Sequence, residues 1–424
     1  MSMEHLDFKI KIALLSLPLA TLLLTGPATG QDAASSGDTA ASEPAIGDAD
    51  YVPYSGPMSA DSTALTSLDS APVASARAMG MAGAISPVAD DLDGIYYNPA
   101  GVGGFGWEGT NPPALRKLYF PYVGAAANAN ASKLNSAFGK EDGARDASIG
   151  SAIVDANAGI RQYGRATLGL GAILKRTAIV PFHDQQMAAI GQGNATDLVD
   201  LRYRSTSGVA WGTSFSDPSA SVFSIGVGGQ YSSIEQIEGQ FAYLDLVNRE
   251  ARTDAIKEYT YKFSGHGLHA GMLWRFGKDG GAPTLAVVAR NTGNTRYTSA
   301  KPEKYDDLVI KEDLVVGFSL SPKLGKSGRM NWVLEAGRIS DNDVTLRKKF
   351  RTGLEFLFGG GPGSYATFGI RGGYNHAGAS AGLSANLGIL TLEAASQAED
   401  IGLENSRVIE RRYVGVFSVN VADF

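Results

Sequence analysis

The feature that most constrains this chain is an alternation of apolar residues with small or polar ones, repeated after about residue 116. In one window, large apolar side chains recur at a spacing of two, at Phe223, Ile225, Val227 and then Tyr231. Side chains alternate between the two faces of a β-strand, so this period predicts strands. Further windows with the same period have apolar members at Leu268, Ala270, Met272, Trp274 and Phe276; Leu314, Val316, Phe318 and Leu320; Met330, Trp332 and Leu334; Leu354, Phe356 and Phe358; and Leu383, Ala385, Leu387 and Ile389.

The residues on the second face decide between two all-β architectures. They are mostly Gly, Ser, Asn and charged residues, and Gly alone makes up 53 of the 424 residues. A soluble β-sandwich, which is the alternative, needs apolar inner faces that pack together. A transmembrane barrel instead turns its apolar face to lipid and leaves the small, polar face around a lumen. The pattern therefore favours the barrel.

Turn-forming residues separate the alternating windows, as expected for hairpins. The turn signals are Ser216-Asp217-Pro218, Lys278-Asp279-Gly280-Gly281, Ser321-Pro322, Ser340-Asp341-Asn342-Asp343 and Gly359-Gly360-Gly361-Pro362-Gly363. A strand needs about 10 residues to cross the membrane, so the roughly 310 residues after Ala114 provide about 12 to 14 strands. We predict an all-β fold, a transmembrane antiparallel β-barrel spanning residues 115–424. Aromatic residues at strand ends, such as Trp274, Tyr259, Tyr261 and Tyr413, are typical of interfacial girdles.

Composition excludes several function classes. The formal net charge is −6, which provides no basic surface for nucleic acid. There is no Cys, so thiolate metal sites and cysteine nucleophiles are excluded. His266 and His269 are the only close histidine pair, and on a strand their spacing points them to opposite faces, which disfavours joint metal ligation. We expect neither an enzyme, a cofactor nor a metal. For an outer-membrane lipase, the alternative, the only candidate member of a catalytic set is His269, near Arg275.

The first 74 residues predict export followed by a spacer. Lys9 and Lys11 precede the apolar run 12–25, and Ala28-Thr29-Gly30 has the small residues of a cleavage site, so residues 1–30 predict a signal peptide. Residues 31–74 are rich in Ala and Ser, acidic and free of Lys and Arg, which is typical of a disordered tether. Together with the barrel pattern, this predicts the outer membrane of a Gram-negative bacterium.

A distinct motif lies in residues 75–114, between the tether and the barrel. It contains Ala76-Arg77-Ala78-Met79-Gly80-Met81-Ala82-Gly83-Ala84, then Val88-Ala89-Asp90-Asp91, then Ile95-Tyr96-Tyr97-Asn98-Pro99-Ala100-Gly101. Gly and Ala allow close backbone approach, aspartates accept hydrogen bonds in a wet lumen, and Asn-Pro favours a turn. This set resembles the N-terminal hatch of the FadL/TodX outer-membrane transporter family. The shared residues are Arg77, Gly80, Gly83, Asp90, Asp91, Asn98, Pro99 and Ala100.

The resemblance implies a barrel of about 14 strands with the N-terminal hatch inside and a lateral exit between strands. It implies passive transport of a hydrophobic small molecule, of the fatty-acid or hydrocarbon class, with the hatch residues as the gate. Its partners would be outer-membrane lipid, the hydrophobic ligand and the barrel assembly machinery. PorV-like relatives provide an alternative, a barrel that binds a secreted protein during secretion or surface assembly. No ligand-binding residue is identified.

Three further segments have less specific patterns. The last predicted strand, with Tyr413, Phe417 and Val421, ends near Phe424, which resembles an aromatic-terminated assembly signal but lies out of phase with it. The insertion 128–160 contains a short helical pattern of unknown role over 148–157. The basic run 347–351 is interpreted as a solvated loop or rim, with contact to lipopolysaccharide as the alternative.

Overall fold

The computed structural model describes most of the predicted barrel and part of the segments that precede it. The described residues are 55–58, 75–102, 117–131, 161–191, 198–216, 222–242, 256–276, 283–325, 327–359, 366–402 and 407–422. The predicted signal peptide 1–30, the helical pattern 148–157 and Phe424 lie outside these residues, as do most of the predicted tether and residues 103–116.

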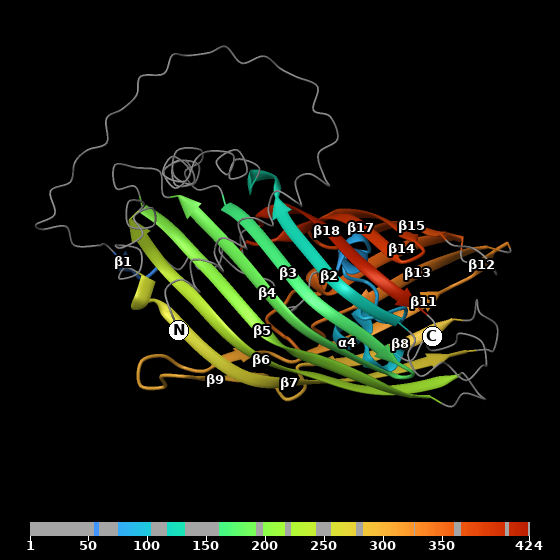
Figure 1. Ribbon diagram of the computed structural model, residues 1–424, viewed down its shortest axis with the longest axis horizontal. Coiled ribbons are helices and arrows are strands. Elements are labelled where there is room, and N and C mark those ends of the chain that lie inside the picture. The colour runs from blue at the N-terminus through green and yellow to red at the C-terminus, as the bar shows by residue number, and fades with distance from the viewer. Residues whose placement is uncertain are drawn as a thin grey trace, which may run out of the picture.

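In the described residues, 14 antiparallel strands close into a barrel (Figure 1). Successive strands pair with each other, and the last, β18, pairs with the first, β2, through registers such as Gly415 with Ala125. This confirms the predicted fold class and strand number. The barrel strands are β2 (Lys117–Asn128), β3 (Arg161–Leu174), β4 (Thr177–Gly191), β5 (Leu198–Ser216), β6 (Phe223–Ala242), β7 (Thr260–Arg275), β8 (Thr284–Arg290), β11 (Asp313–Leu320), β13 (Gly328–Ala336), β14 (Phe350–Gly359), β15 (Ala366–Tyr374), β16 (Ala379–Leu387), β17 (Leu390–Asp400) and β18 (Ile409–Ala422).

Short elements decorate this barrel. Within the predicted tether, β1 (Ser55–Gly56) pairs with β6. The hairpin of β9 (Thr295–Ser299) and β10 (Leu308–Ile310) extends β7, and β12 (Lys323–Leu324) pairs with β13. The 3-10 turn η2 (Ala129–Ala131) follows β2, and the helical turn α9 (Leu346–Lys349) precedes β14.

The two faces of the strands are those that the alternation predicts. Phe223, Ile225, Val227 and Tyr231 point outward and are between 43% and 59% exposed. Neighbouring inward positions such as Ser224 are buried. His266 faces outward and His269 faces inward, as their spacing predicts. The basic run 347–351 is only partly a rim, because Arg351 belongs to β14 and points into the lumen toward Glu335. That part of the interpretation is wrong, since strand alternation turns the residue inward.

The two ends of the barrel differ in the length of their connections. At one end the strands are joined by tight turns, such as those from Leu174 to Thr177 and from Leu387 to Leu390. At the other end the connections are longer, as from Arg290 to Asp313. Bacterial barrels have short periplasmic turns and longer extracellular loops. We therefore assign the end with the longer connections to the cell exterior.

The barrel wall is taller on one side. Strands β5 and β6 have 19 and 20 residues, whereas β8 and β11 have 7 and 8. A membrane crossing takes about 9 to 11 residues. The long, green to yellow strands in Figure 1 therefore project beyond the bilayer at the end assigned to the exterior.

Residues 75–102, here called the inner segment, lie inside the barrel. They form the short helices α3 (Ala76–Gly80) and α4 (Asp93–Tyr97) and the 3-10 turn η1 (Pro99–Gly101). Figure 1 shows this blue segment within the ring of strands. α3 contacts β15 to β18, whereas η1 contacts β5, β6 and β7 on another part of the wall. In the described part of the chain, no helix is long and apolar enough to cross a membrane.

Candidate functional site

The inner segment is built from local hydrogen bonds. Ser75 caps α3 by accepting a hydrogen bond from the Ala78 N–H at 3.0 Å. Asn98 folds the Asn-Pro turn, because its side-chain oxygen accepts from the Ala100 N–H at 3.1 Å. Between them, Gly83 adopts a φ of +82°, a left-handed conformation that favours glycine. These turns make the segment compact enough to fit inside the lumen.

Glycines of the barrel wall provide the space for this segment. A Cβ placed on Gly226 of β6 would lie 2.2 Å from the Ala100 nitrogen, and one on Gly271 of β7 would lie 2.1 Å from Asn98 Oδ1. On the opposite wall, a Cβ on Gly373 of β15 would lie 2.5 Å from the carbonyl carbon of Met81. Real Cβ atoms do not approach other atoms so closely, so the wall residues are small where the segment touches them.

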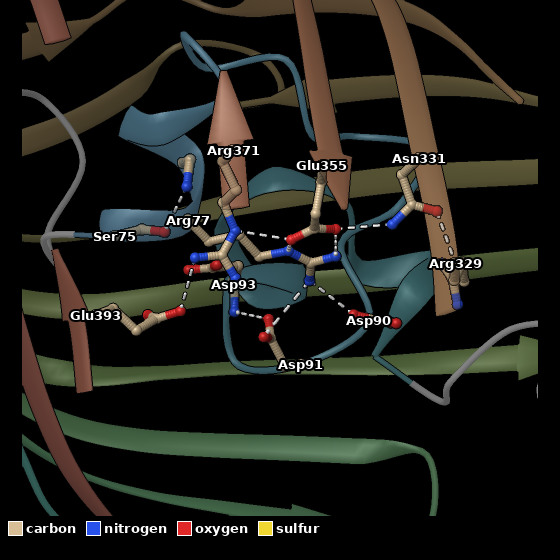
Figure 2. Close-up of polar contacts among 11 residues, drawn as sticks. Ser75, Arg77, Asp90, Asp91, Asp93, Arg329, Asn331, Glu355, Arg371 and Glu393 are labelled. Carbon is tan, nitrogen blue, oxygen red and sulfur yellow. Dashed lines mark hydrogen bonds and ion pairs between the residues drawn. The ribbon is translucent and has the colours of Figure 1, made fainter. Parts of the chain in front are cut away.

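On one side, Arg77 joins the inner segment to the wall through ions. Its guanidinium donates two hydrogen bonds to the Glu355 carboxylate of β14, both at 3.0 Å, and a third to Asp90 at 2.7 Å. Asp91 lies 3.6 Å away. Arg371 of β15 approaches the same Glu355 at 2.8 Å (Figure 2). A bidentate arginine–carboxylate pair fixes both position and orientation.

The remaining donors around Glu355 are also provided by the wall. Asn331 of β13 donates to it at 2.7 Å, and Arg371 also pairs with Glu393 of β17 at 3.2 Å. We call Arg77, Asp90, Asp91, Glu355, Arg371 and Glu393 the acid–arginine network. Every buried charge in this set has an opposite charge beside it, as burial requires.

The aspartates of the inner segment have opposite pKa shifts. Burial raises the pKa of Asp90, but the charges of Arg77 and Arg329 and the hydrogen bond from Arg77 together outweigh this effect, and the pKa is lowered from 3.8. Burial raises the pKa of Asp93 well above its usual range, and the charges of Asp91 and Glu393 act in the same direction. Asp90 is therefore the ionised partner of Arg77, whereas the surroundings of Asp93 favour its protonated form.

On the opposite side, the Asn98-Pro99-Ala100 turn is seated against β6 and β7. The Ala100 carbonyl accepts a hydrogen bond from Ser224 Oγ of β6 at 2.8 Å. Asn98 donates to the Ser86 carbonyl at 3.0 Å, and Ser86 N–H donates to Glu335 of β13 at 2.9 Å. All of these residues are buried, so the turn is a fixed attachment point of the inner segment.

A third contact is apolar. The face of α4 and the residues before it meet a group of inward side chains on β2, β3 and β4. We call this contact the apolar seam; it consists of Leu92, Ile95, Tyr119, Ile173, Val180 and Phe182. Leu92 lies directly over Gly171 of β3, where a Cβ would come within 2.5 Å of its Cδ1. The seam contains no ion pair among the described residues.

A cavity of about 630 Å³ lies above the inner segment. Its floor includes Met79, Ala82, Tyr96 and Tyr97, and its walls are largely charged, as at Arg290 and Lys348. Residues of the long connections border it, so it opens toward the end assigned to the exterior. The entrance of the lumen is therefore polar, and the apolar contacts lie deeper, in the seam. Among the described residues, no cluster of His, Asp and Glu is suited to a metal ion.

The structure divides the predicted hatch residues into two groups. Arg77, Asp90 and Asp91 come together in the acid–arginine network, and Gly80 packs on Gly382 of β16 nearby. Asn98, Pro99 and Ala100 lie on the other wall, against β6 and β7. Gly83 faces Arg351. A role of any of them in gating stays a prediction.

Sequence reasoning missed the wall residues that hold the inner segment. Glu355 is separated from Arg77 by 278 positions, and Ser224 from Ala100 by 124. The only sequence signal for Glu355 is a charged residue on the predicted lumen face, between Leu354 and Phe356. That signal identifies a lumen position but no partner.

Comparison with solved structures finds similar folds among outer-membrane channels. The deltaS2S3 mutant of the monoaromatic hydrocarbon channel TodX has a TM-score of 0.48 and 9% identity, covering 82% of this chain and 99% of that chain. The toluene transporter TodX of Pseudomonas putida has a TM-score of 0.43 and 9% identity, covering 82% and 97%. A FadL homologue of Pseudomonas aeruginosa has a TM-score of 0.43 and 12% identity, covering 82% and 98%. No protein-family model and no curated protein matches the sequence.

Proposed function

We propose that this protein is an outer-membrane channel, not an enzyme, that passes hydrophobic small molecules by way of a hatch formed by the inner segment. The observation that carries the proposal is that two features of the barrel lie at the same place. The apolar seam lies against the part of the wall where the strand ladders of β2, β3 and β4 are interrupted.

The interruptions coincide with two prolines. Between β2 and β3, the register shifts between Tyr119 and Tyr122, on either side of Pro121. Between β3 and β4, pairing stops after Phe182 and resumes at Ile179, on either side of Pro181. Proline has no N–H to donate to a ladder, so these strands are held together more weakly at this height. Such a wall offers an apolar molecule a route between strands into the membrane.

The proposed route has three steps. A ligand enters the polar cavity from outside, moves into the apolar seam beside Leu92 and leaves laterally past Gly171. The Asn98-Pro99-Ala100 turn is the fixed point, and the edge of the segment at Leu92 moves around it. Transport is passive, because the ligand shifts the hatch only through its different affinity for the two hatch positions.

A reversible crosslink tests this route. The chain has no Cys, so the double variant Leu92→Cys/Gly171→Cys contains the only thiols. The Gly171 Cβ position lies 3.4 Å from Leu92 Cγ, near the place that the sulfur of a cysteine at position 92 can occupy, so we expect the two thiols to be within reach of each other. In proteoliposomes, we expect oxidation to slow the entry of a fatty acid or toluene, reduction to restore it, and sucrose entry to stay unchanged. Each single-Cys variant is the control for oxidation alone.

Deletion of residues 75–104 provides a second test of the hatch. We expect the flux of hydrophobic solutes to change more than the flux of sugars, because the apolar seam is lost. Equal changes for both solute classes would contradict gating. The partner-binding alternative would be supported if the purified protein retains a secreted protein and no hydrophobic ligand, and if the crosslink has no effect on solute entry.

A further inference from the structure

An exposed arginine lies flat on the outer surface of the barrel. Arg411 occupies an outward position of β18, where its neighbours in the alternation, Ile409 and Tyr413, face the same way. Its guanidinium donates to Ser396 Oγ of β17 at 2.9 Å and to the Ala379 carbonyl of β16 at 3.1 Å. Both acceptors are neutral, so these bonds hold the guanidinium in place without compensating its charge.

A second arginine borders the same turn. Arg407 is exposed and donates to the His376 carbonyl at 2.7 Å and to the Ala377 carbonyl at 3.1 Å. Ala377 and Ala379 are two residues apart, so the two guanidiniums flank one connection, that between β15 and β16. Across the ranges that the structure describes, neither arginine forms an ion pair with a carboxylate.

The surface below the two arginines is apolar. Tyr374, at the end of β15, is 56% exposed and pairs in register with Ala379, whose carbonyl accepts from Arg411. Ile370 and Leu383 are a cross-strand pair below it, 51% and 60% exposed. Exposed tyrosines mark the interface of a membrane, and an arginine on a lipid-facing position is tolerated only near that interface. The arginines therefore lie at the height of the lipid head groups.

On the taller wall, an outward basic residue has a carboxylate partner within the described chain. There, the outward Lys262 of β7 lies 3.9 Å from the carboxylate of Glu235 on β6. Its outward neighbours along β7 are Ser264 and His266. Among the described residues, the guanidiniums of Arg407 and Arg411 thus differ from this paired lysine in having only neutral partners, which leaves them suited to an external anion.

We propose that Arg407 and Arg411 bind phosphate groups of the acylated, phosphorylated glycolipid of the outer leaflet, with its acyl chains along Tyr374, Ile370 and Leu383. A guanidinium presents a planar pair of donors that matches phosphate oxygens. The continuity of the two arginines with the lipid-facing apolar surface selects a lipid phosphate over a free anion. The proposal is independent of the transport function, because it requires only that the barrel lies in that membrane with its longer connections at the exterior.

Native mass spectrometry of the full-length protein in detergent micelles tests the proposal. The probes are bisphosphorylated lipid A and the same lipid with both phosphates removed. We expect Arg407→Gln/Arg411→Gln to weaken binding of the phosphorylated lipid roughly tenfold. Arg411→Lys, which keeps the charge but loses the planar fork, should have an intermediate effect. The matched control is Lys262→Gln, which removes a basic residue that already has a protein partner.

Four results would overturn the proposal. The first is that the double variant binds phosphorylated lipid A as tightly as the wild type, and the second is that Lys262→Gln weakens this binding as much as the double variant does. The third is that the wild type binds the dephosphorylated lipid as tightly as the phosphorylated one. The fourth is that millimolar inorganic phosphate displaces the lipid. The last would indicate a site for free anions. A shift in electrophoretic mobility on heating reports whether each variant is folded. If the double variant is not folded, Arg411→Lys decides the test.

Discussion

The two walls that hold the inner segment do so by different physical means. On the wall formed by β13 to β17, Arg77 is bound by charged hydrogen bonds to Glu355, and these bonds have strict directions. On the wall formed by β2 to β4, Leu92 and Ile95 are held by apolar contact over a glycine. Apolar contact is non-directional and allows sliding, whereas a buried ion pair resists separation. The comparison indicates which edge of the segment is suited to stay and which to move.

The largest effect is expected on the ionic wall. Arg77→Met leaves Glu355 buried with Arg371 as its one remaining arginine, and breaking a buried pair in this way costs about 3–5 kcal/mol. Hydrogen exchange of the peptide containing α3, read by mass spectrometry, should rise strongly, while η1 changes less. Arg77→Met/Glu355→Gln should recover part of the loss. Exchange at α3 equal to that of the wild type would show that the network is not what holds this side.

The attachment of the Asn-Pro turn should be the next most sensitive. Gly226→Ala places a methyl group 2.2 Å from the Ala100 nitrogen, so the turn or β6 must shift. Overpacking of this kind costs about 1–3 kcal/mol. The matched control is Gly372→Ala on β15, where the nearest atom to the added methyl is 3.9 Å away. We expect faster hydrogen exchange at η1 and a lower melting temperature for Gly226→Ala but not for Gly372→Ala. Similar behaviour of the two variants would show that the Asn98-Pro99-Ala100 turn is not held against Gly226.

A smaller change in stability is expected at the apolar seam. Leu92 is only partly buried, so Leu92→Ala should cost about 1 kcal/mol, roughly half of a full leucine burial. Its functional effect should be larger than its cost in stability, because the seam is the proposed route. Entry of a hydrophobic solute into proteoliposomes should rise while sucrose entry stays constant. A rise in both would mean that the variant loosens the whole segment.

The smallest expected effect is on the pH dependence of stability, and it compares two aspartates of the inner segment. Because the pKa of Asp93 is raised, the folded protein holds its proton more tightly than the unfolded chain does. The free energy of unfolding therefore falls as the pH rises above 3.8 and through the folded-state pKa. Asp93→Asn should remove this fall and stabilise the protein at pH 7, as measured by melting temperature from pH 4 to 8.

Asp90→Asn is the matched control for that measurement. The pKa of Asp90 is lowered, so its contribution is present above 3.8 and is lost as the pH falls through its folded-state value. At pH 7 this variant should be destabilised, opposite in sign to Asp93→Asn. If both variants shift stability in the same direction, the assignment of an ionised Asp90 and a protonated Asp93 is wrong.

The sequence by itself determined the strands, their faces and the motif of the inner segment. These follow from local rules, since a period of two assigns Phe223 and Ile225 to one face whatever they contact. The turn signals, such as Ser321-Pro322 directly after β11, also depend on a few neighbouring residues. Arg77 and Asn98-Pro99-Ala100 were recognisable because they lie together in one short stretch.

Only the tertiary structure decided which wall residues meet that stretch. The pairing of β18 with β2 closes the barrel and sets the height of every strand, and this brings Glu355 to Arg77 and Gly226 to Ala100. Alternation assigns Gly226 to the lumen face, but nothing local shows that the Ala100 nitrogen lies 2.2 Å from its Cβ position. The physical reason is that register and closure are properties of all the strands together, whereas alternation belongs to each strand alone.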